Sequence, residues 1–290
     1  MDYLHEAQIR DFLPARPTDS HKGTFGRAVI VGGQYGMAGA PLLATRAALR
    51  CGVGLAEAAV PRSIYPILAG AVPEAIFTPL PENEAGQLDE TALPPLLKRL
   101  NGTSSLVLGC GLGQGAGVRA LVRELLTAAG CPLVLDADGI NAVDTHILSQ
   151  EEGRGPRILT PHPGEMARLC GLTVAKVQAD RAELAAKTAR EWQAVVVLKG
   201  HHTVIAGPDG RLAVNPTGNP GMATGGSGDV LAGMIGGLLA QGVPPWEAAA
   251  AGAYLHGLAG DRATKALSRT ALLPSDIIGE LCGLFADWGL

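Results

Sequence analysis

A glycine-rich segment that ends in an aspartate carries the strongest chemical pattern in this sequence. It runs from Asn215 to Asp229 (NPTGNPGMATGGSGD), and the apolar run VLAGMIGGLLAQG follows it. Gly225, Gly226 and Gly228 allow consecutive backbone N–H groups to point at one place. A helix that starts near Asp229 adds the positive end of its dipole. The segment therefore predicts a binding site for phosphate or for developing negative charge.

Asp229 is the candidate general base of this segment. A carboxylate beside bound phosphate is unfavourable for binding alone, but it can take a proton from a hydroxyl group that attacks phosphorus. The backbone N–H groups of Gly226, Ser227 and Gly228 would then form an anion hole. The simpler interpretation is an aspartate cap after a flexible turn. The length of the patterned segment, from Asn215 to Leu231, favours the catalytic interpretation.

Carboxylates follow a second apolar run, in the motif Asp136 to Asn141 (DADGIN). At the carboxyl end of a strand they could hold Mg²⁺ through water, because Mg²⁺ keeps much of its hydration. Asp138 could equally be a cap at the strand exit. In the motif LTPHPGE, Pro161 and Pro163 stiffen the loop and fix where His162 points. Glu165 either caps the helix that follows or helps to order a metal ion.

A third strand-end motif, VVVLKGHHT, combines a cation with a glycine. Lys199 can offset phosphate charge, and Gly200 allows the chain to approach a ligand closely. His201 and His202 are adjacent, so in an extended chain they face opposite ways, and a two-histidine metal site is not expected.

A dehydrogenase-type dinucleotide site is an alternative. The stretch from Gly111 to Ala116 matches G-x-G-x-x-A, and Asp136 ends the next strand. The match lies in the middle of the chain and leaves the segment from Asn215 to Asp229 unexplained.

The elements that must position these residues alternate between strands and helices. Several predicted strands are apolar throughout, as buried parallel strands are; the strands are Arg27–Val31, Leu55–Val60, Ser105–Gly109, Pro132–Leu135, Arg157–Leu159 and Ala194–Leu198. A hairpin is predicted from Thr203–Ala206 and Arg211–Val214. The predicted helices are Pro41–Cys51, Thr91–Leu100, Val118–Ala129, Val177–Trp192 with Thr173 as a possible cap, Asp229–Gln241, Trp246–Leu267 and Pro274–Trp288. Repeated strand–helix units predict an α/β, doubly wound, mostly parallel sheet with helices on both faces. The polar stretch Pro81–Gln87 is expected to be a surface loop.

The motifs, taken in order, resemble those of the NAD(P)H-hydrate dehydratases, a family of ribokinase-like fold. The run NPGMATGGSGDVLAG resembles the family signature, with Ser227 where threonine is usual. The resemblance also includes His21–Gly33, Gly36–Arg50 and Gly52–Leu55, and it extends over about residues 20 to 285.

The resemblance implies a reaction and a set of roles. ADP or ATP would phosphorylate the ring hydroxyl of (6S)-NADHX or (6S)-NADPHX, and loss of phosphate would restore NADH or NADPH; ADP is the expected donor, and Mg²⁺ would bridge phosphates. The hydrated nucleotide would contact Ala40, Gly113, His162 and Asp229. The phosphoryl donor would contact Lys199, Gly200, His201, His202, Thr203 and Gly228. A kinase of a small alcohol and a nucleotide-sensing module are the alternatives, although sensing does not need the base Asp229.

Composition limits the remaining possibilities. The 290 residues, 47% hydrophobic and 17% charged, suit one α/β domain over residues 1–290. The net charge of −4 gives no whole-surface attraction for nucleic acid or an anionic membrane. Five cysteines without a CxxC pair, and no apolar signal segment in residues 1–10, suggest a cytoplasmic protein. A homo-oligomer, with a tetramer favoured, is expected by analogy. An NAD(P)HX epimerase is expected as a separate protein, since only twenty residues precede His21.

Overall fold

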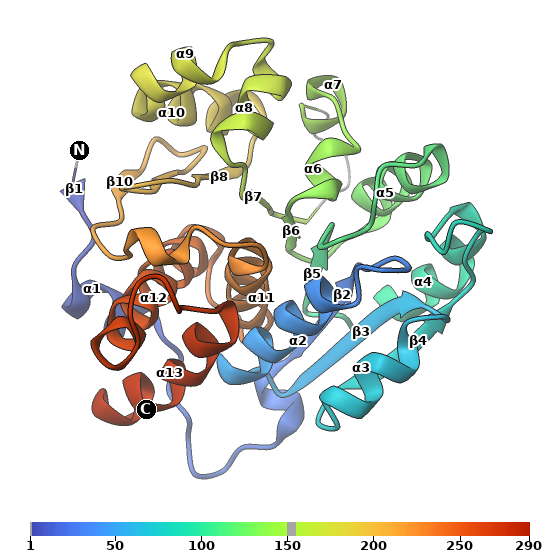
Figure 1. Cartoon of the computed structure of the whole chain (residues 1–290), viewed down its shortest axis with the longest axis horizontal. Helices are drawn as coiled ribbons and strands as arrows, with labels where there is room; N and C mark the ends of the chain where they lie inside the picture. The colour runs from blue at the N-terminus through green and yellow to red at the C-terminus, as the bar shows by residue number, and fades with distance from the viewer. Residues whose placement is uncertain (1, 150–154) are drawn as a thin grey trace.

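The computed structural model describes residues 2–149 and 155–290 and is built around one twisted sheet (Figure 1). The strands of the described residues follow the order β1-β10-β9-β8-β7-β6-β5-β2-β3-β4. They are β1 (Asp2–Tyr3), β2 (Arg27–Val31), β3 (Leu55–Pro61), β4 (Ile76–Leu80), β5 (Ser105–Leu108), β6 (Leu133–Leu135), β7 (Arg157–Leu159), β8 (Val195–Leu198), β9 (Val204–Ala206) and β10 (Leu212–Val214). All neighbouring strands are parallel except that β9 is antiparallel to β8 and β10. The predicted mostly parallel sheet and its hairpin are confirmed.

Helices cover both faces of the sheet. They are α1 (Glu6–Phe12), α2 (Gly39–Arg50), α3 (Tyr65–Ala71), α4 (Leu93–Leu100), α5 (Ala116–Ala128), α6 (Asp138–Asn141), α7 (Thr145–Leu148), α8 (Pro163–Cys170), α9 (Val174–Ala179), α10 (Arg181–Glu191), α11 (Ser227–Ala240), α12 (Pro245–Ala266) and α13 (Pro274–Asp287). Short 3₁₀ turns are η1 (Lys22–Phe25), η2 (Glu90–Ala92) and η3 (Pro220–Met222). Side chains of β2 alternate between two cores: Ala28 and Ile30 pack with α2, α11, α12 and α13, while Val29 and Val31 pack with α4, α5, α8 and α10.

The chain reverses its direction of winding between β2 and β5. From β2 it proceeds outward through β3 to β4, then returns to β5 on the other side of β2 and proceeds to β8. The carboxyl ends of β2 and β5 therefore flank a topological switch point, where open α/β sheets bind ligands. The loop of Gly32 and Gly33 follows β2, and the loop of Cys110 follows β5. Gly33 donates its N–H to the carbonyl oxygen of Cys110 at 2.8 Å, which ties the two loops together.

Helix α11 lies unusually close to its neighbours because of its glycines. A Cβ atom at Gly237 would lie 2.8 Å from the carbonyl oxygen of Ala48 in α2. One at Gly233 would collide with the Ala44 carbonyl, and one at Gly236 with the side chain of Val107 in β5. These glycines bring the helix onto α2 and the sheet, so its N-terminus reaches the switch point.

Several predicted helix boundaries are wrong. Helix α2 begins at Gly39 instead of Pro41, and α5 begins at Ala116 instead of Val118. The predicted helix Val177–Trp192 is two helices, because the backbone of Asp180 (φ −124°, ψ 35°) leaves the helical range between α9 and α10. Thr173 caps α9, as considered possible, by accepting the N–H of Lys176. The helix predicted from Thr91 begins as the 3₁₀ turn η2 and becomes α-helical at Leu93. The helix predicted to begin at Asp229 begins at Ser227.

The sequence also left several elements unpredicted. Strand β1 is only two residues long, and strand β4 contains Pro79, which lacks the N–H of a ladder donor and is tolerated because β4 is an edge strand. The expected loop Pro81–Gln87 is confirmed, and the side chain of Asn83 closes it by accepting the N–H groups of Ala85 and Gln87. In residues 2–149 and 155–290, no helix has the length and apolar character needed to cross a membrane.

Candidate active site

The glycine-rich turn forms the start of helix α11. Gly226 is the N-cap with φ 96°, a backbone conformation that favours glycine, and a Cβ atom there would lie 2.7 Å from Cδ1 of Leu43. The N–H groups of Gly226 and Gly228 have no protein acceptor among the described residues, whereas the N–H of Ser227 donates to the carbonyl of Thr224 at 3.3 Å. The predicted anion hole therefore depends first on Gly226 and Gly228.

Ser227 also has a side-chain partner that the sequence did not indicate. Its hydroxyl lies 3.3 Å from Nε2 of His256, a buried residue of α12. Burial lowers the pKa of His256 to about 4, so the ring is neutral near pH 7. The hydroxyl is therefore held inside the fold, beside α12.

Asp229 lies in the first turn of α11, close to two other titratable groups. Ligand atoms of Asp229, Asp136 and Cys110 all lie within 4.8 Å of one another. Burial and, after it, the Asp136 carboxylate raise the pKa of Asp229, while a hydrogen bond from Cys110 and the charge of Lys199 lower it; the resulting pKa is about 6. A pKa near 6 leaves a carboxylate that is ionised at pH 7 yet more basic than an ordinary aspartate, as a general base requires.

Lys199 is held beside this helix start. Its Nζ donates to Oδ1 of Asp136 at 2.8 Å, and the hydroxyl of Thr160 donates to the same oxygen at 2.6 Å. The backbone N–H of Lys199 donates to the carbonyl of Pro161 at 2.9 Å. A Cβ atom at Gly228 would lie only 3.3 Å from the Lys199 Nζ. Burial alone would lower the pKa of Lys199, but the carboxylates of Asp136 and Glu165 raise it, so the side chain stays charged.

The segment Gly200–Thr203 forms an exposed turn between β8 and β9. The prediction that His201 and His202 face opposite ways is wrong, because the chain turns there instead of staying extended: His202 has φ 56°, and the two rings stack with centroids 3.9 Å apart. The His202 ring also contacts the edge of Tyr3. The hydroxyl of Thr203 donates to the carbonyl of Gly200 at 3.0 Å.

His162 and Glu165 form a reciprocal cap at the start of α8. Nδ1 of His162 accepts the N–H groups of Gly164 and Glu165, and the Glu165 carboxylate accepts the N–H of His162 at 2.7 Å. Because Nδ1 is an acceptor, the neutral ring carries its proton on Nε2. Burial raises the pKa of Glu165 to about 7, against the opposing charge of Lys199. The capping role considered for Glu165 is confirmed.

Ala40, in the first turn of α2, and Gly113, in the loop after β5, lie on either side of the switch point. Ala40 is near the start of α2, and a Cβ atom at Gly111 would lie 2.9 Å from its side chain. Gly113 has φ 81° and donates its N–H to Oδ2 of Asp138 at 2.8 Å. A Cβ atom at Gly113 would collide with the amide groups of Gln34 and Gln87. Both segments thus depend on small residues that lie close to neighbouring side chains.

The alternative of a dehydrogenase-type site is not supported by this geometry. The G-x-G-x-x-A match follows the fifth strand of the chain, and Asp136 is buried with Oδ1 committed to Lys199 and Thr160. Its carboxylate instead faces the glycine-rich start of α11, where a Cβ atom at Gly228 would lie 3.7 Å from Oδ2, so Asp136 belongs to that site and does not mark a separate ribose site.

Residues suitable for a metal ion are Asp136 and Asp229. Both offer carboxylate oxygens, which suit Mg²⁺, but Cys110 in the same cluster is a thiol, which Mg²⁺ does not favour. Glu165, the other metal candidate, is outside that cluster and is engaged in the α8 cap. The donor set therefore fits a hydrated Mg²⁺ held at the carboxylates of Asp136 and Asp229, rather than a closed protein cage.

Sequence reasoning missed several residues that shape the site. Cys110 was not singled out, yet it lies two residues after the end of β5 and forms a hydrogen bond with Asp229. Its position at the carboxyl end of a strand was the available signal. Thr160 directly follows β7 and so carried the same signal, whereas Arg181 carried none, because its partners at the end of β8 are distant in sequence.

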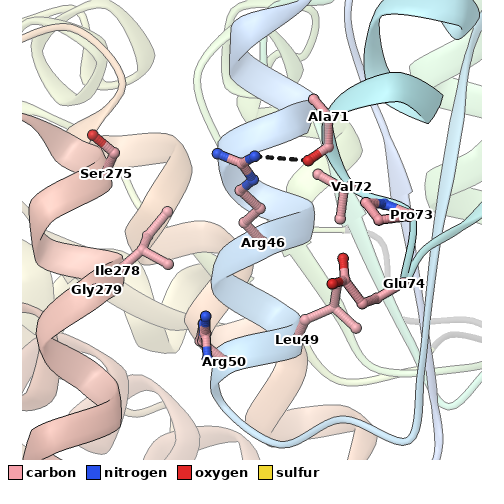
Figure 2. Close-up of a pocket in the computed structure, with 10 residues that line it drawn as sticks. All are labelled: Arg46, Leu49, Arg50, Ala71, Val72, Pro73, Glu74, Ser275, Ile278 and Gly279. Atoms are coloured by element: carbon pink, nitrogen blue, oxygen red, sulfur yellow. Dashed lines mark hydrogen bonds between the residues drawn. The ribbon is translucent and has the colours of Figure 1, made fainter.

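A cavity of about 530 Å³ lies elsewhere, between α2, α13 and the segment that follows α3 (Figure 2). Arg46 and Arg50 of α2 line it, together with Glu74 and Ser275, and Arg46 donates to the carbonyl of Ala71. None of the predicted site residues lines this cavity, and its mixture of opposite charges and apolar atoms suggests no particular ligand.

Comparison with known proteins identifies related enzymes. The family model for NAD(P)H-hydrate dehydratase matches residues 28–282. The bifunctional NAD(P)H-hydrate repair enzyme of Moorella thermoacetica is 52% identical over 96% of this chain, which spans 52% of that enzyme's length. The ADP-dependent (S)-NAD(P)H-hydrate dehydratase of Neisseria meningitidis is 48% identical over 85% of this chain and 80% of its own.

Solved structures give the same result. The ADP/ATP-dependent NAD(P)H-hydrate dehydratase of Bacillus subtilis, co-crystallised with ATP and Mg²⁺, superposes with a TM-score of 0.85 at 36% identity, over 99% of this chain and 98% of that one. A ribokinase-like superfamily protein of Enterococcus faecalis superposes with a TM-score of 0.84 at 29% identity, over 99% and 96% of the two chains. The predicted ribokinase-like architecture is confirmed, and the chain belongs to the NAD(P)H-hydrate dehydratase family.

Proposed function

We propose that this protein uses ADP to dehydrate (6S)-NADHX and (6S)-NADPHX, which restores NADH and NADPH and releases AMP and phosphate. Membership of the family supports the proposal, and so do the names of the relatives. The observation that carries it is Asp229: a carboxylate with a pKa of about 6, placed in the first turn of α11 beside the unpaired N–H groups of Gly226 and Gly228. This arrangement suits proton removal next to a transferring phosphoryl group.

The proposed chemistry has two stages. Asp229 takes the proton of the ring hydroxyl while the hydroxyl oxygen bonds to the terminal phosphorus of ADP. The phosphoanhydride bond breaks at the same time and releases AMP. Phosphate then departs from the ring carbon, the neighbouring carbon loses a proton, and the ring double bond forms again. Phosphorylation turns a poor leaving group into a good one, which explains the use of a kinase-like fold for a dehydration.

The residues around Asp229 supply binding and orientation. Lys199 lies beside Gly228, so its ammonium group and the helix N-terminus act on the same phosphate charge. Gly200, His201, His202 and Thr203 extend this surface for the rest of the nucleotide. On the other side, Ala40, Gly113 and His162 would contact the hydrated nucleotide, and the Nε2–H of His162 makes it a hydrogen-bond donor to that substrate.

Mg²⁺, when bound, would neutralise charge on the phosphates, and the carboxylates of Asp136 and Asp229 would hold its water ligands. Glu165, which is part of the α8 cap, is a weaker candidate than Asp136 and Asp229 for holding the metal ion. ADP is the proposed donor in preference to ATP. We also propose a single domain over residues 1–290, a homo-oligomer with a tetramer favoured, and a cytoplasmic location.

Replacement of Asp229 by asparagine tests the assignment of the base. D229N keeps the shape of the side chain but cannot accept the proton, so turnover should fall by about 10²- to 10⁴-fold. Binding of ADP, measured by calorimetry, should persist. The control is D276N, which changes the aspartate in the first turn of α13 and should retain turnover. Near-normal turnover in D229N would reject Asp229 as the base.

A further inference from the structure

The turn that follows β8 is held by a single side chain from another element. Arg181 lies in the first turn of α10 and reaches the end of β8, where its Nη2 donates to the carbonyl of Leu198 at 2.8 Å and its Nη1 to that of Lys199 at 3.2 Å. A longer contact of 3.5 Å joins Nη2 to the carbonyl of His202. One guanidinium group therefore donates hydrogen bonds to carbonyl groups at both ends of the turn.

Gly200 makes this contact possible. It has φ 143°, and a Cβ atom at this position would lie 2.7 Å from Nη1 of Arg181. The guanidinium thus lies directly against the backbone of the turn. The break between α9 and α10 at Asp180 brings Arg181 to this place, and Gln178 of α9 accepts a hydrogen bond from Nη1 at 3.1 Å.

The arrangement fixes Lys199 from three directions. Its N–H donates to Pro161, its carbonyl accepts from Arg181, and its ammonium is paired with Asp136. Of these three contacts, only the hydrogen bond to Pro161 comes from the neighbouring strand. Without Arg181, the backbone that carries Lys199 and begins the exposed turn would lose its support on the α10 side.

We infer that Arg181 is a positioning residue for the nucleotide-binding turn: its guanidinium sets the path of residues 198–202 and thereby aims Lys199 at the phosphates of a nucleoside diphosphate. The inference rests on the proposed function, because it assigns that turn to the phosphoryl donor. Arg181 does not contact the reacting atoms. A planar fork with several N–H donors suits carbonyl groups that lie in different directions, whereas the single ammonium of a lysine cannot reach them together.

The test compares R181Q and R181K with R190Q, which changes an exposed arginine of the same helix. Affinity for ADP is measured by calorimetry without the hydrate, and KM is measured separately for ADP and for (6S)-NADPHX. R181Q should weaken ADP binding and raise the KM for ADP by at least about tenfold, because a small displacement of a binding group is costly. The KM for the hydrate should change less than about twofold, R181K should recover only part of the loss, and R190Q should match the wild type.

A second substitution tests the mechanism through the backbone. G200A places a methyl group against the guanidinium, so it should weaken ADP binding in the same direction. Because both changes act on one contact, the loss of ADP affinity in the double variant R181Q/G200A, relative to the wild type, should be much smaller than the product of the two single losses.

Several results would overturn the inference. Unchanged ADP affinity in R181Q would do so, as would equal increases in both KM values with a matching loss of thermal stability, which would indicate a general structural role. If the wild type turns over the hydrate with ADP and R181Q does so equally well, only this inference is rejected. Wild-type protein that binds neither ADP nor ATP would reject the proposed function as well.

Discussion

Asp229 is subject to opposing influences within a few ångströms. Burial and the Asp136 carboxylate raise its pKa, while the Cys110 thiol and Lys199 lower it, and the result is about 6. The glycine turn in the sequence identified Asp229 as the candidate base, since the residues that make the turn are contiguous. Its environment could not be predicted, because Cys110, Asp136 and Lys199 come from three separate strand ends.

The pKa of Asp229 predicts the pH dependence of the reaction. The base must be ionised, so kcat/KM should rise with pH through about 6. C110A removes a hydrogen bond to the carboxylate, which should raise the pKa of Asp229 and move the acidic limb of the profile to higher pH. At about pH 6 the variant should keep less than about half of the wild-type kcat/KM.

Two controls accompany the pH profile. C110S keeps a hydroxyl donor at the same place, so its acidic limb should stay near that of the wild type. C282A changes the exposed cysteine of α13 and should have no effect. An acidic limb that moves to lower pH in C110A would contradict the assigned direction of the hydrogen bond.

At the scale of elements, the start of α11 depends on one glycine more than on its neighbours. Gly226 has φ 96° and faces Leu43, whereas a Cβ atom at Gly225 would meet nothing within 4 Å. The sequence indicated a permissive turn but could not tell these glycines apart, since the difference arises from α2 and α13. The break at Asp180 was missed for a similar reason: the apolar pattern continues through it, and the partner of Arg181 is at the end of β8.

The pair G225A and G226A turns this difference into a stability prediction. G226A should lower the free energy of unfolding by at least about 1 kcal/mol, because alanine is strained at positive φ and its methyl group collides with Leu43. G225A should change it by less than about 0.5 kcal/mol. Chemical denaturation of both variants measures the difference, and equal stabilities would contradict the geometry assigned to the helix start.

At the scale of the whole molecule, buried ionic contacts hold the β3–β4 side of the sheet. Glu57 of β3 is fully buried and accepts hydrogen bonds from Arg27 of β2, Arg99 of α4 and Thr78 of β4. The strands that flank the switch point were predicted to within about a residue or two from their apolar runs, because burial on both faces leaves a strong pattern. The edge elements α3 and β4 were not predicted, because exposed and proline-containing segments leave a weak apolar pattern.

E57Q should destabilise the protein by about 3 kcal/mol at pH 7, because it leaves two arginines without their buried partner. Burial would raise the pKa of Glu57, but its hydrogen bonds to Thr78, Arg99 and Arg27 lower it below its usual value of 4.5. Its contribution is therefore present above the unfolded-state pKa and is lost as the pH falls through the lower folded-state pKa.

Denaturation curves over a range of pH should consequently show the difference between wild type and E57Q shrinking in acid. The control E191Q breaks an exposed ion pair with Lys187 and should cost less than about 1 kcal/mol. If the loss of stability caused by E57Q grows as the pH falls, the assigned direction of the pKa shift of Glu57 is contradicted.

The most direct measurement is recovery of the near-ultraviolet absorbance of reduced nicotinamide from purified (6S)-NADPHX, with Mg²⁺ and either ADP or ATP. The proposal predicts a rise that requires nucleotide, is faster with ADP, and forms one AMP for each NADPH. No rise with either donor, from folded protein that still binds ADP, would contradict it. Accumulation of a stable phosphate ester without NADPH would show a kinase instead of a dehydratase.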